Sequence, residues 1–106
     1  MDIQARIKNG LCKVRIDGEM TIYQAVEMKP KLMKQLERAN QLEIDLSGVS
    51  EFDSAGLQLL ILLKREATQH GKVLRLLAHS LAVLEVFSLT RADTLFGDLM
   101  VLPSGS

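Results

Sequence analysis

An α/β fold with a mixed sheet is predicted from changes of hydrophobic period along the 106-residue chain. Apolar residues alternate with polar ones in the first segment, then recur every three or four residues, and then alternate again, which predicts strands and helices in turn. Two strands precede the first helix, and later strands and helices follow one another singly. We therefore expect about five strands, an N-terminal hairpin followed by parallel strands, and helices packed mainly on one face.

The first two strands are predicted at residues 3–7 and 11–16, where apolar and polar residues alternate. The residues between them, Lys8-Asn9-Gly10, are typical of a turn. These features predict an N-terminal hairpin.

A helix is predicted next, because apolar residues recur at helical spacing up to Asn40. The residues of this stripe are Ala25, Met28, Leu32, Leu36 and Ala39. We expect Thr21 to be the N-cap, and we expect Pro30 to kink the helix or to break it near Lys29.

The rest of the chain alternates strands with helices. Strands are predicted at 42–46 and 73–77, helices at 55–70 and 80–89, and a short helical turn at 94–96. Gly71 is a helix stop signal, and Ser80 is able to cap the helix that follows it. We expect a single domain over residues 1–100 and a flexible C-terminal tail over 101–106.

Composition excludes several classes of function. Thirteen basic and thirteen acidic residues give a formal charge of zero, and no run of like charge indicates a nucleic-acid or membrane-surface partner. A single cysteine, Cys12, cannot form an internal disulfide, so a reducing compartment is the simplest setting. The longest apolar run, 59–63, is too short to span a bilayer. We therefore expect a soluble, cytoplasmic protein without direct membrane contact.

The loop before the second long helix contains the residues that bear most directly on function. The chain leaves a strand, passes through residues 51–54 and enters the helix at or beside Ser54. One interpretation is capping, with Asp53 or Ser54 accepting a hydrogen bond from the first turn. The other is phosphorylation of Ser54, because a helix N-terminus favours anions.

Catalysis is the weaker interpretation of this sequence. His70 and His79 flank a predicted strand and lack the companion ligands of a zinc site, so we expect them at the surface. Asp45 and Asp53 have no phosphate-binding loop beside them, and Ser54 lies outside a nucleophile-elbow motif. We expect no enzymatic activity, no metal and no cofactor.

The second long helix is more apolar than packing on one sheet requires. Gln58 is the only polar residue from Ala55 through Leu63. The helix is either central, between two others, or it contributes some of its leucines to a partner surface. Helical spacing assigns Leu60, Leu63 and Ala67 to the core, and leaves Leu57, Leu59 and Leu62 as candidates for that surface.

Four short motifs together resemble the STAS domain family, named for sulfate transporters and anti-sigma factor antagonists. They are GEMT at 18–21, IDLSGV at 44–49, FDSAGL at 52–57 and EVFSLT at 85–90. The resemblance runs from about Ile3 to Phe96 and implies a STAS-like sheet without a catalytic centre.

In the bacterial regulatory members of that family, the serine after the loop aspartate is phosphorylated by a kinase that is also an anti-sigma factor, and a metal-dependent phosphatase reverses the reaction. Ser54 occupies that position. The resemblance implies a partner-switching signal-transduction module acting in transcription regulation, a monomer or weak dimer, with that kinase and phosphatase as partners. The implied partner-binding residues are Thr21, Asp53, Ser54, Ala55, Gly56, Leu57, Gln58, Leu59 and Leu62.

Thr21 departs from the regulatory pattern, because regulatory members usually have an aspartate there that helps to engage the kinase. Two alternatives therefore stay open. Some short STAS proteins are subunits of lipid-transport ABC systems, bound permanently to the ATPase. Others are partner-switch scaffolds of chemotaxis or biofilm pathways.

Overall fold

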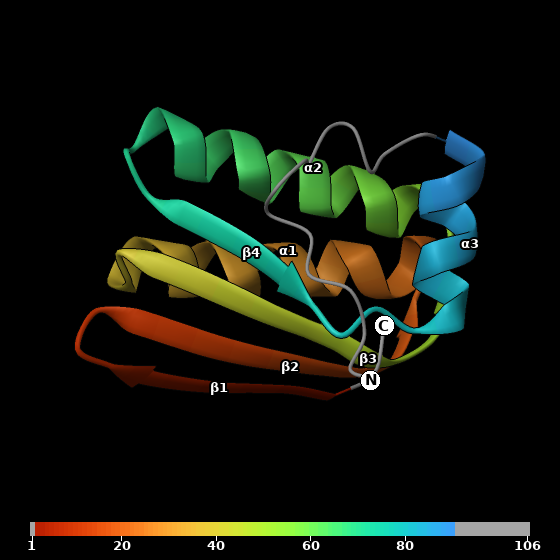
Figure 1. Ribbon diagram of the computed structural model, residues 1–106, viewed down its shortest axis with the longest axis horizontal. Coiled ribbons are helices and arrows are strands. Elements are labelled where there is room, and N and C mark those ends of the chain that lie inside the picture. The colour runs from red at the N-terminus through yellow and green to blue at the C-terminus, as the bar shows by residue number, and fades with distance from the viewer. Residues whose placement is uncertain (1, 91–106) are drawn as a thin grey trace.

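The computed structural model describes residues 2–90, which form four strands and three helices (Figure 1). In chain order the elements are β1 (Asp2–Lys8), β2 (Leu11–Met20), α1 (Ile22–Arg38), β3 (Gln41–Phe52), α2 (Ser54–Gln69), β4 (Val73–Leu77) and α3 (Leu81–Thr90).

The strands form one mixed sheet in the order β1-β2-β3-β4. β1 and β2 are antiparallel, whereas β2, β3 and β4 are parallel to one another. This confirms the predicted α/β class, the hairpin and the parallel pairing of the last two strands. The sheet has four strands within residues 2–90, not the expected five or so. The expected helical turn at 94–96 and the tail at 101–106 lie outside the described residues.

The hairpin closes through a two-residue turn, because Lys8 and Leu11 face each other in the register. Asn9 and Gly10 both have positive φ, at 53° and 80°. Positive φ at both central positions is the conformation that fits the right-handed twist of the flanking strands, and asparagine and glycine adopt it most readily.

β2 and β3 extend further than the sequence predicts. The sequence predicts that β2 ends at Ile16 and that β3 ends at Leu46, yet the two strands stay paired as far as Met20 and Phe52. The register shifts between Arg15 and Asp17 and again between Gly18 and Glu19. The strands continue past Gly18 and Gly48 because these irregularities adjust the pairing there. Residues 51–52 therefore belong to β3, and Asp53 alone separates β3 from α2.

α1 runs through Pro30 without a break, so of the two effects expected of this proline, a kink or a break near Lys29, the break does not occur. A proline in the helix interior lacks the N–H that would bond to the carbonyl four residues earlier, here that of Val26. Pro30 and Val26 both lie on the exposed side of α1, where water can solvate that carbonyl. The opposite side buries Ala25, Met28 and Leu32, as predicted.

α1 and α2 pack against each other and cover one face of the sheet, while α3 lies at the end where β3 finishes (Figure 1). Alternate residues of β2 and β3 face the helices and are buried, among them Val14, Ile16 and Ile44. Leu60, Leu63 and Ala67 of α2 complete this core, as the helical spacing predicted. The other face of β2 carries the exposed residues Lys13 and Arg15.

The C-terminal end of α2 and the N-terminal end of α3 have the predicted capping residues. One of the two histidines, however, does not lie at the surface as expected. Gly71 follows the C-cap of α2 with φ at 67°, and the hydroxyl of Ser80 accepts a hydrogen bond from the N–H of Val83 at 3.3 Å. His70 is exposed as expected. His79 is buried, because its ring packs edge-on against Phe87 with the centroids 5.6 Å apart. The prediction of a surface position for His79 was wrong.

Candidate docking site

One carboxylate joins the N-termini of α1 and α2. Asp53 is the N-cap of α2, and its Oδ1 accepts hydrogen bonds from the N–H groups of Ala55 at 2.9 Å and Gly56 at 3.2 Å. Its Oδ2 accepts the N–H of Ile22, the first residue of α1, at 3.3 Å. Asp53 therefore satisfies N–H groups that the first turns of two helices would otherwise leave without partners.

Thr21 occupies the N-cap position of α1, as predicted, but its side chain does not cap the helix. The hydroxyl is directed toward Gln24 and donates a hydrogen bond to its Oε1. Gln24 in turn donates from Nε2 to Glu19 at 3.2 Å. Asp53 thus supplies a cap that Thr21 was expected to provide.

Ser54 is the first residue of α2 and its side chain is exposed. Asp53, and not Ser54, makes the capping bonds, so of the two residues considered for this role only Asp53 has it. Within residues 2–90 the hydroxyl of Ser54 has no hydrogen-bonding partner. The serine side chain is therefore accessible and takes no part in capping α2.

Gly56 allows the first turn of α2 to lie close to the ends of β2 and β3. A Cβ at this position would lie 2.5 Å from the carbonyl oxygen of Met20 and 2.9 Å from the ring of Phe52. Such distances are shorter than van der Waals contact, and one of them involves backbone that cannot turn away. Only glycine permits the end of β2 to lie against the first turn of α2.

An apolar groove of about 380 Å³ lies between α1 and α2 and is lined at the start of α2 by Ala55, the residue after Ser54. Its lining residues are Ile22, Ala25, Val26, Lys29, Ala55, Gln58, Leu59 and Leu62. Ile22 and Val26 are 58% and 72% exposed, and the neighbouring Tyr23 is 81% exposed. Large apolar side chains with this exposure are typical of a contact surface.

Sequence reasoning missed Ile22, Tyr23 and Val26. The signal was present, because Ile22 and Val26 are four residues apart and therefore share a face, but they lie off the stripe that begins with Ala25. An apolar pair outside the core stripe of an amphipathic helix marks a second surface.

The predicted partner-binding residues fall into two groups. Ser54, Ala55, Gln58 and Leu62 are exposed or half-buried on the face that carries the groove, and the half-buried Thr21 and Asp53 are the N-cap residues of α1 and α2. Gly56, Leu57 and Leu59 are buried, although Leu59 forms part of the groove floor. Their burial indicates that Gly56 and Leu57 shape the surface from beneath.

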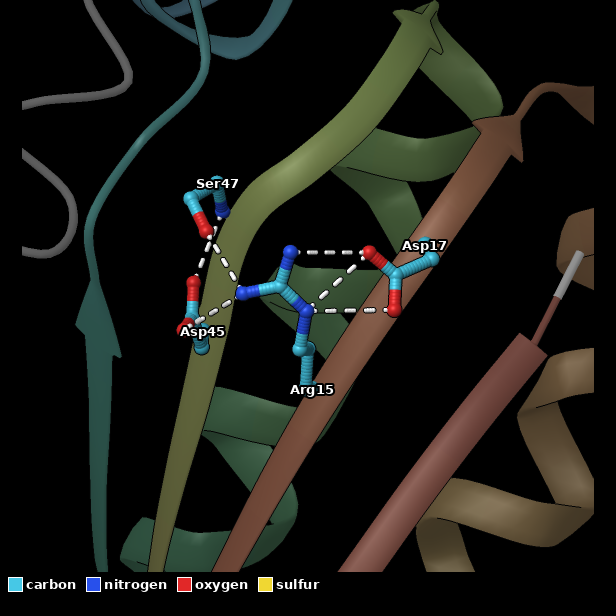
Figure 2. A network of polar contacts seen from close by, with 4 residues as sticks. All are labelled: Arg15, Asp17, Asp45 and Ser47. Carbon is cyan, nitrogen blue, oxygen red and sulfur yellow. Dashed lines mark hydrogen bonds and ion pairs between the residues drawn. The ribbon is translucent and has the colours of Figure 1, made fainter.

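A separate polar cluster lies on the sheet face away from α1 and α2 (Figure 2). The Nε of Arg15 donates to both carboxylate oxygens of Asp17 at 3.0 and 3.1 Å, and its guanidinium also reaches Asp45 at 3.4 Å and the hydroxyl of Ser47 at 3.1 Å. The hydrogen bonds that Arg15 donates to the Asp17 carboxylate raise the pKa of Arg15. Asp45 and Ser47 are therefore occupied here, and Asp45 forms no carboxylate pair with Asp53.

Other chemistry finds little support in the part of the chain that the structure describes. No group of histidine, cysteine or acidic side chains there is arranged to hold a metal ion. Burial raises the pKa of the Cys12 thiol, which contacts Gln35 and stays protonated near neutral pH. No described helix combines the length and apolar character needed to cross a bilayer.

Comparison with protein families gives a match over residues 3–102 to the model described as "Mlab, STAS domain". This match covers nearly the whole chain, and the four motifs in the sequence lie within it.

Solved structures share the fold at low identity. An anti-sigma factor antagonist from Mycobacterium paratuberculosis superposes with a TM-score of 0.81 at 21% identity, covering 97% of this chain and 85% of that one. A putative anti-sigma factor antagonist from Thermotoga maritima gives 0.81 at 20% identity, covering 96% and 86%. The Bacillus cell fate determinant SpoIIAA in its phosphorylated form gives 0.75 at 18% identity, covering 98% and 93%.

Proposed function

Because the chain belongs to the STAS domain family, we propose that it is a non-enzymatic, anti-sigma factor antagonist-like module that binds a cytoplasmic serine kinase through the first turns of α1 and α2. The observation that carries this proposal is the position of Ser54. An exposed serine that makes no capping bond follows the residue that caps both helices, and its neighbours on α2, Ala55 and Gln58, line an apolar groove.

In the unphosphorylated state the partner covers Ser54 and the groove. Ile22 and Val26 of α1 and Leu62 of α2 offer apolar area that gains free energy when a partner removes it from water. Ser54 lies beside this area, so a partner seated in the groove desolvates the serine as well.

Phosphorylation of Ser54 would add a charge of about −1.5 to −2 next to the Asp53 carboxylate. The start of α2 tolerates an anion, because the helix dipole favours negative charge there by about 0.3–1 kcal/mol. In the complex, the partner would desolvate the phosphate and face two adjacent anions, and this costs far more binding free energy than the helix dipole returns. The domain would keep its fold while the complex dissociates, and a phosphatase would restore binding.

The test is to purify the protein with its bound partners from cells that produce it, as wild type, Ser54→Ala and Ser54→Asp. We expect fragment mass spectrometry to find phosphate on Ser54, not on Ser47, Ser50 or Thr68. The hydroxyl of Ser47 accepts a hydrogen bond from Arg15, and the hydroxyl of Thr68 donates one to the carbonyl of Lys64. Both hydroxyls are therefore less available for phosphorylation than that of Ser54. Ser54→Ala should retain a kinase that Ser54→Asp releases.

Thr21 favours a second candidate, a permanent subunit of a lipid-transport ABC system bound to the ATPase. This position has no carboxylate to engage a kinase, and the Thr21 hydroxyl is already committed to Gln24. A permanent subunit would copurify with an ATPase equally well in the wild type and in Ser54→Ala, and would carry no phosphate. That result would replace the switch with the transport function.

A further inference from the structure

β1 is a free edge of the sheet within residues 2–90, where it pairs with β2 alone (Figure 1). Its seven residues pair without a register shift and include no proline. The helices pack mainly over β2, β3 and β4. The apolar residues on the helix side of β1 are therefore incompletely covered: Ala5 is exposed and Ile7 is 37% exposed. An edge of this kind, without a proline or a bulge, is able to pair with another strand where its charged side chains find opposite charges.

The outward backbone groups of β1 belong to its apolar residues. The pair Lys8–Leu11 closes a two-residue hairpin, so it is a hydrogen-bonded pair, and bonded pairs alternate with non-bonded ones along an antiparallel ladder. Ile7, Ala5 and Ile3 occupy the non-bonded positions opposite β2. Their N–H and C=O groups therefore point away from the sheet.

We propose that β1 pairs with β1 of a second copy, antiparallel and centred on Ala5. The sequence DIQARIK is self-complementary in this register. Ile3 lies opposite Ile7 of the second copy, Ala5 opposite Ala5, and Gln4 opposite Arg6. Asp2 takes the register position opposite Lys8, so residues of opposite charge are matched at both ends. The outward groups of Ile3, Ala5 and Ile7 all find partners.

The neighbouring symmetric registers are poorer. Centring on Arg6 sets two arginines directly opposite each other, and like charges in that position are destabilising. Centring on Gln4 shortens the ladder and pairs Ile3 with Ala5 instead of with Ile7. The register centred on Ala5 is therefore selected by both charge and apolar contact.

The proposed dimer has one continuous sheet of eight strands. A two-fold axis perpendicular to the sheet places the helices of both copies on the same side, and the two strands run in opposite directions. The two Ser54 docking sites then lie at opposite ends of one face. A single ladder of this length buries a small area, so we expect association in the range of about 10–100 μM, typical of a small transient interface.

Cysteine pairing tests the register directly. Gln4 and Arg6 of the second copy form a non-bonded pair with an expected Cα separation of about 4.5 Å, within the range for a disulfide. Mixing the full chains Gln4→Cys and Arg6→Cys under mild oxidation should give a crosslinked dimer at least about ten times faster than either variant alone. Gln4→Cys alone would crosslink fastest in the register centred on Gln4, and Arg6→Cys alone in the register centred on Arg6, so either result overturns the proposal.

Sedimentation velocity over a concentration series tests the edge itself. Ala5→Pro removes an outward N–H from an edge strand, where proline is tolerated, and should weaken self-association at least about tenfold without changing the circular dichroism spectrum. If the wild type stays monomeric up to about 1 mM, the proposal is wrong. The crosslinking experiment keeps the test valid if Ala5→Pro fails to fold.

Discussion

The adjacent residues Asp53 and Ser54 divide two duties that sequence reasoning could assign to either of them. Asp53 holds the first turns of α1 and α2 through three N–H groups. Ser54 is exposed and contributes no capping bond. The structural role and the proposed regulatory role therefore fall on separate side chains, and substitutions should separate them.

We expect Asp53→Ala to lower the free energy of unfolding by about 1–3 kcal/mol, because losing one N-cap costs about 0.5–2 kcal/mol and this residue serves two helices. Ser54→Ala should change it by less than about 0.5 kcal/mol, as surface substitutions do. Urea unfolding followed by circular dichroism measures both. Equal losses in the two variants would mean that the cap is shared.

At the scale of elements, the contact between β2 and α2 depends on Gly56. We expect Gly56→Ala to cost about 1–3 kcal/mol, because the added methyl group would clash with the Met20 carbonyl. Gln58→Ala, an exposed change in the same helix, is the matched control and should cost less than about 0.5 kcal/mol. Thermal unfolding distinguishes the two variants. A Gly56→Ala protein as stable as the wild type would show that the end of β2 moves aside freely.

The two sides of α2 should respond differently to charge. Leu60 is fully buried, so Leu60→Asp should cost more than about 4 kcal/mol and unfold the domain. Leu62 is half-buried at the groove, so Leu62→Asp should cost about 1 kcal/mol and chiefly weaken partner binding. Leu59 lines the groove but is only 5% exposed, so Leu59→Asp should destabilise the domain as Leu60→Asp does. Unfolding of Leu62→Asp to the same extent as Leu60→Asp would contradict the surface role.

At the scale of the whole molecule, binding and folding should be separable at Ser54. We expect Ser54→Asp to unfold in urea within about 1 kcal/mol of the wild type, because a carboxylate at the start of α2 is favoured by the helix dipole. The same variant should lose its partner, though less completely than the phosphorylated protein, since a carboxylate carries less charge. A Ser54→Asp protein that binds as tightly as the wild type would refute the switch.

Periodicity predicted the order and type of every described element and the burial of Leu60, Leu63 and Ala67, but not the burial of Leu57 and Leu59. It could not predict that β3 continues to Phe52, because Ser47-Gly48 resembles a turn and only pairing with β2 keeps it extended. Nor could it place His79, whose burial depends on Phe87 from a later helix. Only the α1 side of the groove was missed: the spacing of Ile22 and Val26 places them on one face, but that they meet Ala55, Gln58 and Leu62 depends on how α1 and α2 pack.

The independence of Ser54 from the cap has an evolutionary consequence. Replacing that serine removes the only hydroxyl available for modification at the start of α2, and the scaffold does not have to be rebuilt, since Asp53 and Gly56 hold the junction. A lineage could therefore convert a reversible regulator into a constitutive assembly subunit, or recover the regulator, through one codon. The same geometry is thus compatible with both proposed functions, the reversible regulator and the permanent assembly subunit.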